Sequence, residues 1–245
     1  MKKQMISLSA ALITGWVVLS SCNNSGLSSK LQEPITTQTD NARAAESGTS
    51  GQEGMGAASV SAKEKTTADL LAAFKGETAA SAKYSAYSQK AEQEGYHEIA
   101  LLFKAASAAE KIHANNHKTI LAETGIKIPE VKPEFTVKST KENLQDAIRG
   151  ENYEATTMYP EFLKDAEAEG VQMAQISLTY AFMTEKKHQA LYEKALTALG
   201  SNTVKSLSSV YYVCPTCGNT YDAAPPQRCG ICMTASEKFI KINSI

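Results

Sequence analysis

The sequence has few aromatic residues and almost no net charge. Of its 245 residues, 7% are aromatic, one is Trp, and the formal net charge is −1 at pH 7. Without an excess of Lys and Arg, the chain lacks the basic surface that nucleic-acid binding requires, so we expect no nucleic acid among its partners. Ala, Glu and Lys are plentiful instead, and this composition favours a mostly α-helical protein.

The N-terminal apolar run, residues 5–19, is too short to span a membrane. It follows two lysines and is typical of a secretory signal peptide, here residues 1–21. The sequence Leu-Ser-Ser-Cys22 resembles a bacterial lipobox, which implies cleavage before Cys22 and lipid on its sulfur. We therefore expect an exported lipoprotein, periplasmic or at the cell surface, whose acyl chains anchor it to a membrane. An ordinary signal peptide followed by an unrelated cysteine is the alternative.

Aromatic residues are absent between Trp16 and Phe74. Within this interval, residues 22–65 are mostly Ser, Thr, Gly, Ala and Gln, which cannot bury enough apolar surface to order the chain. We expect this segment to be a disordered tether. A flexible chain of about 40 residues has an r.m.s. span of about 35 Å.

The remainder of the chain contains an internal repeat. The matching elements are Gly76-Glu77 with Gly150-Glu151, Ala91–Gly95 with Ala166–Gly170, and Glu110 and His113 with Glu185 and His188. The first match has an offset of 74 residues and the others an offset of 75, so one insertion separates them.

Each half of the repeat predicts two helices. Breaks at glycines and a capping box beginning at Ser139 place the four helices at about 67–93, 97–123, 140–169 and 172–199. The connection between the halves carries two prolines and is long for a helix hairpin, so it should cross one end of the bundle. Four antiparallel helices with one long crossover indicate a ferritin-like four-helix bundle, here residues 66–204.

Two Glu-x-x-His sequences suggest a metal site inside this bundle. Residues three apart share one face of a helix, and carboxylate with imidazole suits a transition metal. Bundle proteins with two metals use one Glu from each of two helices and Glu-x-x-His from each of the other two. The candidates in that pattern are Glu77, Glu110, His113, Glu151, Glu185 and His188, with Glu154 one turn beyond Glu151. So many buried carboxylates would repel one another unless cations joined them.

One further histidine and one alanine refine this pattern. Glu154 has no acidic counterpart, because Ala80 occupies the equivalent place in the first half. His117 lies four residues after His113, but its counterpart is Tyr192, so we interpret His117 as outside the ligand set.

The C-terminal segment, residues 205–245, contains two Cys-x-x-Cys pairs. Cys214 with Cys217 and Cys229 with Cys232 have the spacing of a tetrathiolate metal site. Iron and zinc both fit four sulfurs. Two disulfides are the alternative, because exported proteins form them readily. So short a segment needs either a bound metal or disulfide bonds in order to fold.

Together these residues resemble the rubrerythrin family. The resemblance covers about residues 67–245 and rests on Gly76-Glu77, Glu110-x-x-His113, Gly150-Glu151-Asn-Tyr-Glu154, Met158-Tyr159-Pro160 and Glu185-x-x-His188. It implies a rubredoxin-like β module after the bundle, with one iron on the four cysteines. It also implies two irons bound by Glu77, Glu110, Glu151, Glu154, Glu185 and His188. On reduction, one iron would exchange Glu154 for His113. Tyr84 and Tyr159 would hydrogen-bond to ligand carboxylates.

The function that the resemblance implies is a peroxide reductase. Hydrogen peroxide would be reduced to water at the di-iron centre, with electrons relayed by the iron–tetrathiolate centre. The family commonly forms homodimers, and the electron donor is not specified by the sequence. The alternatives are a ferroxidase that uses oxygen, an iron-binding protein without turnover, and a structural zinc-ribbon bundle.

Overall fold

The computed structural model describes the backbone of residues 54–245 and the side chains from residue 63 onward. The predicted signal peptide, Cys22 and most of the predicted tether therefore lie outside the described residues. The described residues form one compact unit, so the predicted bundle and the predicted C-terminal module pack together. Within the described residues, no helix has both the length and the apolar character needed to cross a membrane.

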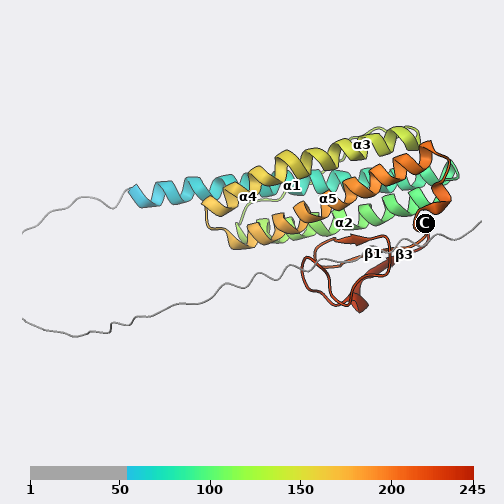
Figure 1. Ribbon diagram of the computed structural model, residues 1–245. Helices are drawn as coiled ribbons and strands as arrows, with labels where there is room; N and C mark the ends of the chain where they lie inside the picture. The colour runs from blue at the N-terminus through green and yellow to red at the C-terminus, as the bar shows by residue number, and fades with distance from the viewer. Residues whose placement is uncertain (1–53) are drawn as a thin grey trace, which may run out of the picture. The chain divides into compact units, whose positions relative to one another are not determined.

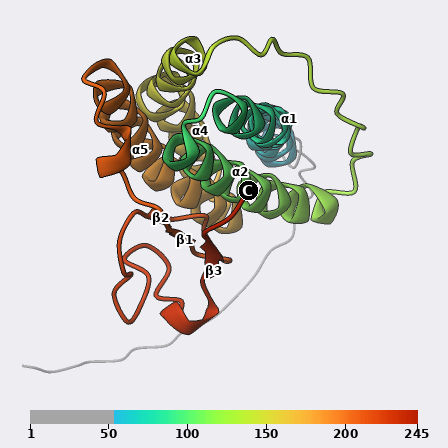
Figure 2. The same ribbon diagram turned by 90° about the vertical axis from the view of Figure 1, so that its right-hand side faces the viewer.

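Four helical segments form the bundle, which confirms the predicted ferritin-like fold (Figures 1 and 2). The first, second and fourth segments are single α-helices, and the third is interrupted. Their bounds are α1 Gly54–Gln93, α2 His97–Glu123, α3 Thr140–Tyr153, α4 Tyr159–Ala168 and α5 Gln172–Gly200. The capping box predicted at the start of α3 is present, since the Ser139 and Glu142 side chains bond reciprocally to backbone N–H groups.

The start of α1 differs from the sequence-based expectation. The helix begins at Gly54, so residues 54–65 of the predicted tether are helical. The absence of aromatic residues argued only against core burial, whereas Ala, Lys and Glu in this stretch are good helix formers. The end of this stretch is also held by tertiary contacts, because Lys65 pairs with Asp165 and the Thr66 backbone N–H donates to Glu169 at 3.0 Å.

The third helical segment contains a π-helix at Glu154–Met158, between α3 and α4. A π-helical turn holds one more residue than the α-helical turn it replaces, and such turns are common at functional sites. The repeat offset changes from 74 to 75 between Glu151 and Tyr159, which is where this turn lies. The single insertion inferred from the repeat is therefore this π-helix.

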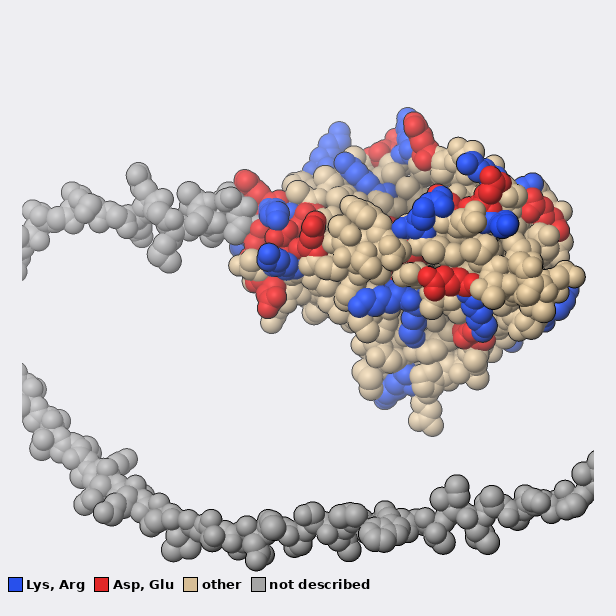
Figure 3. Space-filling view, turned by 45° about the horizontal axis from the view of Figure 1, so that its top comes forward, with Lys and Arg blue, Asp and Glu red and all other residues tan. Residues whose placement is uncertain are grey.

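The connection of residues 124–139 runs along the outside of α1 (Figure 2). It is fixed there in part by Tyr87, whose hydroxyl donates to the Thr136 carbonyl at 3.3 Å and to Asp146 at 3.0 Å. The chain therefore crosses from the end of α2 to the start of α3 without entering the core. The surface face in Figure 3 shows positive and negative side chains interspersed.

Two hydrophobic clusters fill the bundle, one on each side of a polar middle layer. The first includes Tyr84, Phe103 and Tyr192, whose rings pack edge to face or tilted with centroids 5.1–6.0 Å apart. The second includes Leu121 and Leu178, both fully buried. Apolar layers on both sides shield the polar layer from solvent.

The C-terminal segment forms a three-stranded antiparallel sheet that packs against α2 and α5. Its strands are β1 Tyr211–Val213, β2 Thr220–Tyr221 and β3 Ile240–Ile242, in the order β2-β1-β3. Two short 3₁₀ helices, Val204–Ser206 and Ser236–Lys238, precede β1 and β3. Tyr211, Val213 and Ile242 belong to the first hydrophobic cluster of the bundle. The sheet therefore completes the bundle core, and the cysteines form a small separate cluster with Ile231 and Phe239.

Candidate metal centre

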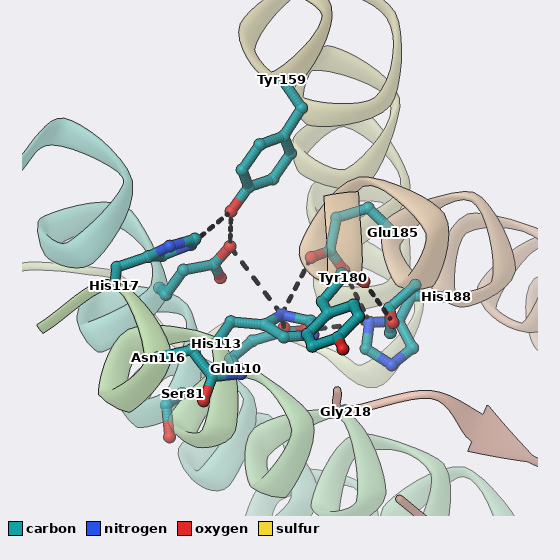
Figure 4. Close-up of polar contacts among 12 residues, drawn as sticks. Ser81, Glu110, His113, Asn116, His117, Tyr159, Tyr180, Glu185, His188 and Gly218 are labelled. Carbon is teal, nitrogen blue, oxygen red and sulfur yellow. Dashed lines mark hydrogen bonds and ion pairs between the residues drawn. The ribbon is translucent and has the colours of Figure 1, made fainter. Parts of the chain in front are cut away.

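Six polar side chains converge in the middle layer of the bundle from four helices (Figure 4). They form two overlapping groups whose possible ligand atoms lie within 4.8 Å of one another. The first group is Glu77, Glu110, His113 and Glu185, and the second is Glu110, Glu151, Glu185 and His188. Glu110 and Glu185 belong to both groups. The arrangement therefore offers two adjacent metal positions with two shared carboxylates.

The two histidines face the shared carboxylates from opposite sides. Nδ1 of His113 lies 2.9 Å from Glu110 and 3.0 Å from Glu185. Nδ1 of His188 lies 3.0 Å from Glu110 and 3.1 Å from Glu185. Since Glu-x-x-His places both side chains of a pair on one helix face, α2 and α5 each supply one terminal imidazole and one shared carboxylate.

The bonding of these groups is incomplete within the protein, as a metal site requires. Eight side-chain atoms of the six residues are buried without a hydrogen-bond partner among the described residues, both Nδ1 atoms included. Burial, together with the charges of Glu185, Glu154 and Glu110, raises the pKa of Glu77 well above its usual value. Burial and neighbouring carboxylates raise the pKa of Glu151 in the same way. Two cations would remove this repulsion and give every free atom a partner.

Glu154 lies apart from both groups. It is the first residue of the π-helix and is partly exposed. Burial, followed by the charges of Glu185 and Glu110, raises the pKa of Glu154 to about 8, so it lies within electrostatic reach of the site. The structure thus places His113, and not Glu154, beside Glu77. This is the arrangement that the sequence-based hypothesis assigns to the reduced site.

Two tyrosines hold the outer carboxylates in a crossed pattern. The Tyr84 hydroxyl of α1 donates to Glu151 of α3 at 2.6 Å, and the Tyr159 hydroxyl of α4 donates to Glu77 of α1. Burial raises the pKa of both tyrosines well above the usual value, so both remain neutral donors. Each half of the repeat therefore positions the outer carboxylate of the other half.

His117 was interpreted from the sequence as outside the ligand set, and it belongs to neither group. It is nevertheless fully buried next to the site, where its Nε2 lies 3.3 Å from the Tyr159 hydroxyl and its Nδ1 lies 2.9 Å from Ser177 Oγ. Sequence reasoning gave neither His117 nor Ser177 a role. The available signal was spacing, since His117 lies one helical turn after His113 on the same face.

The four cysteines of the C-terminal segment form a third metal-binding group, with Sγ atoms within 4.8 Å of one another. Cys214 Sγ lies 3.4 Å from Cys232 Sγ, and Cys217 Sγ lies 3.5 Å from Cys229 Sγ. All four are free, and these separations are much longer than the roughly 2.05 Å of a disulfide bond. They approach the roughly 3.8 Å expected for sulfurs about 2.3 Å from a tetrahedrally bound metal.

The surroundings lower the pKa of Cys214 and Cys229 and raise the pKa of Cys217 and Cys232, so the thiolate form is favoured locally at the first two. Although burial opposes ionisation of Cys229, the backbone N–H of Cys232 and the Asn219 side chain lower its pKa. Asn219 Nδ2 lies 3.4 Å from Cys229 Sγ. Donors of this kind stabilise thiolate ligands and adjust the reduction potential of a bound iron.

The C-terminal segment also contacts both histidines of the bundle site directly. Nε2 of His113 lies 3.0 Å from the Cys217 carbonyl oxygen, and Nε2 of His188 lies 3.0 Å from Thr220 Oγ1. Thr220 Oγ1 donates to the Gly218 carbonyl at 3.0 Å and so accepts from His188. Each imidazole therefore carries its proton on Nε2 and leaves Nδ1 free for a metal, which is the usual way that outer hydrogen bonds orient ligand histidines.

Comparison with known proteins identifies the family. The Rubrerythrin family profile matches residues 69–196. Rubrerythrin-2 of Clostridium acetobutylicum is 35% identical over 182 residues, which cover 74% of this chain and 98% of that protein. The chain belongs to the rubrerythrin family.

Nigerythrin offers both a sequence and a structural comparison. Nigerythrin of Nitratidesulfovibrio vulgaris is 34% identical over 187 residues, covering 76% of this chain and 90% of that protein. The structure of the fully reduced, all-ferrous state of nigerythrin superimposes with a TM-score of 0.66 at 33% identity, covering 72% of this chain and 86% of that one. Family membership and the three ligand groups together assign two irons to the bundle and one iron to the four cysteines.

Proposed function

We propose that this rubrerythrin-family protein is a peroxide reductase that converts hydrogen peroxide to water. Irons held by the carboxylates and histidines of the bundle would supply the electrons that cleave the O–O bond, and an iron held by the four cysteines would replace them one at a time. The observation that carries the proposal is the direct contact between the two kinds of metal site. A structural bundle or an iron store needs no such contact, whereas a reductase must refill its site with electrons.

The contact runs through one hydrogen bond. Cys217 belongs to the cysteine group and His113 to the bundle group, and the His113 Nε2–H donates to the Cys217 carbonyl at 3.0 Å. Thr184 Oγ1 approaches the same carbonyl oxygen at 3.3 Å. An electron can therefore pass from the sulfur through the Cys217 backbone to the imidazole without crossing solvent.

Burial of the bundle site supports a small oxidant. None of its six polar side chains is more than 1% exposed. A site so closed admits only a molecule of the size of hydrogen peroxide or oxygen, and it keeps bulk water away from the reaction. Glu154 and His113 remain the proposed pair of alternative ligands, and Tyr84 and Tyr159 the proposed donors to the ligand carboxylates.

Anaerobic stopped-flow mixing tests the proposal. The fully reduced, iron-loaded protein should be oxidised by hydrogen peroxide faster than by an equal concentration of oxygen, with a red iron–tetrathiolate band appearing as electrons leave the cysteine site. Faster oxidation by oxygen would replace the proposal with a ferroxidase. Zinc on the cysteines, seen by metal analysis, would remove the relay and leave a structural role for that site.

The protein's location is a separate proposal that rests on the sequence alone. We propose that Cys22 carries lipid and that the protein is exported and membrane-anchored. An exported reductase cannot draw directly on cytoplasmic NADH, so its donor must act on the outer side of the inner membrane. We also propose a homodimer, which sedimentation of the iron-loaded protein would test.

A further inference from the structure

A chain of four hydrogen-bonded side chains leads away from the bundle metal site. It runs from Ser177 Oγ to His117 Nδ1 at 2.9 Å, from His117 Nε2 to the Tyr159 hydroxyl at 3.3 Å, and from Tyr159 to Glu77. In Figure 4, dashed lines join the Tyr159 hydroxyl to the His117 ring and to a carboxylate close to His113. Ser177 is 4% exposed, whereas His117 and Tyr159 are fully buried. Ser177 is therefore the member of the row with residual solvent exposure, and Glu77 at the other end belongs to the metal site.

The hydrogen bonds of this row all donate in the same direction, from Ser177 towards Glu77. Tyr159 has one proton and donates it to Glu77, so its oxygen must accept from His117 Nε2–H. A neutral imidazole protonated on Nε2 has a lone pair on Nδ1, which accepts from Ser177 Oγ–H. His117 has hydroxyl partners only, and burial lowers its pKa to about 3, so the ring is neutral.

We propose that Ser177, His117 and Tyr159 form a proton path that serves the bundle metal site. The inference rests on the proposed function, because reduction of hydrogen peroxide by two electrons consumes two protons and yields two water molecules. Those protons must enter a site whose six converging residues are at most 1% exposed. A hydrogen-bonded path supplies them without admitting bulk water.

Each transfer breaks one bond to hydrogen and forms another. A proton leaves Ser177 Oγ for His117 Nδ1, and one leaves His117 Nε2 for the Tyr159 oxygen. The original Tyr159 proton passes beside Glu77 to the peroxide oxygen that leaves as water. Water returns a proton to Ser177 Oγ. His117 exchanges one tautomer for the other and gains no charge.

The other half of the repeat lacks this path. Tyr84 bonds to Glu151 as Tyr159 bonds to Glu77, but Tyr192 stands in the place of His117. The Tyr192 hydroxyl is buried and has no hydrogen-bond partner among the described residues. Leu102 occupies the place equivalent to Ser177. Among the described residues, no equivalent row of side chains therefore leads through Tyr84 to Glu151.

The test compares His117→Gln and Ser177→Ala with wild type, using Tyr192→Phe as the matched control. Glutamine can still donate an amide N–H to Tyr159, but it cannot exchange tautomers as imidazole does. Reduced, iron-loaded proteins are mixed with hydrogen peroxide in H₂O and in D₂O. We expect both path variants to react about 10²-fold more slowly, at the low end for a lost proton donor, with a larger solvent isotope effect. Tyr192→Phe should match wild type in both respects.

A second measurement does not depend on turnover. Nitrogen-15 NMR of the zinc-substituted protein should show His117 protonated on Nε2 and not on Nδ1. A proton on Nδ1, or a His117→Gln variant with the wild-type rate and isotope effect, would overturn the path. Wild type that reacts with oxygen but not with peroxide would overturn the proposed function instead. The same variants would then decide the path in the oxygen reaction, which also consumes protons.

Discussion

Gly218 is the point where the cysteine module touches the bundle metal site most closely. Its φ is +75°, and a Cβ at this position would lie 2.3 Å from His113 Nε2. Real Cβ contacts are essentially never shorter than 3.0 Å and are ordinarily 3.4 Å or more, so in Gly218→Ala the two elements must separate by about 1 Å to reach ordinary contact. The His113–Cys217 hydrogen bond, 3.0 Å long in the native protein, would then be lost.

The expected loss of unfolding free energy in Gly218→Ala has two parts, which a matched variant can separate. Alanine at positive φ costs about 1–2 kcal/mol, and a buried hydrogen bond left unmade costs about 1–3 kcal/mol. Gly125 also has φ +75°, but nothing lies within 4 Å of its added Cβ. Gly125→Ala should therefore lose only the first part, and Gly218→Ala both.

Thermal unfolding of the metal-loaded proteins measures this difference. A loss of 1 kcal/mol lowers the Tm of a domain this size by about 2–4 °C, so Gly218→Ala should melt several degrees below Gly125→Ala. Gly218→Ala should also slow electron transfer between the two metal sites, whereas Gly125→Ala should not. Equal Tm values and equal transfer rates in the two variants would show that Gly218 does not lie against His113 in solution.

Four other perturbations have defined outcomes. Cys22→Ser should release the protein from the membrane fraction, and a wild-type protein found soluble with unmodified Cys22 would contradict the lipobox interpretation. In the metal-free protein, burial raises the pKa of Glu154 from 4.5 to about 8, so the folded state binds more protons than the unfolded state between these values. Its unfolding free energy should therefore fall as pH rises through this range. Urea titrations at several pH values measure this free energy, and a value that rises with pH would refute the raised pKa of Glu154. Glu154→Ala should leave two irons bound in the reduced protein but weaken iron binding in the oxidised protein by at least about 10-fold. Loss of a residue that only hydrogen-bonds to a metal ligand already has an effect of about this size. His113→Ala should do the reverse, and crystals in which neither residue approaches iron in either state would exclude the ligand exchange.

The helices of the bundle were predictable because local signals mark them. Glycine breaks, a capping box and apolar spacing gave 97–123 for the second helix, which is also where α2 lies. The start of α1 was missed because composition indicates whether a segment can join a core, not whether it can be helical. Helix propensity and the contact of Thr66 with Glu169 decided that point instead.

The change of repeat offset in the sequence indicated one inserted residue, but it did not indicate that the insertion forms a π-helix. An inserted residue in a helix can be accommodated by a loop, a kink or a π-turn. The π-turn at Glu154–Met158 keeps the helix continuous, so Glu151 and Tyr159 both reach the site from one helical segment. Tertiary packing selected this solution, and no local spacing rule contains that information.

The placement of the metal-site residues followed from repeat and spacing, whereas their outer partners did not. Spacing indicates which face of a helix a residue occupies, but not which element covers that face. Thr220 and Gly218 lie far along the chain from His188 and His113, and only the folded sheet brings them together. His117 was set aside for the same reason, since its role depends on Ser177 of another helix.

The differences between the two halves of the repeat gather at one metal position. A duplicated bundle could fold with identical halves, and the shared elements here do match: one outer carboxylate, one tyrosine donor and one Glu-x-x-His in each half. Glu154 facing Ala80 and His117 facing Tyr192 break that symmetry. Both departures affect Glu77, because the charge of Glu154 acts on it and His117 bonds to its tyrosine donor, although the charge of Glu154 acts on Glu151 as well. Since neither departure is needed to close the bundle, we infer that the metal position beside Glu77 and His113 is the one that changes ligands and receives protons. The position beside Glu151 and His188 would then keep its ligands through the reaction.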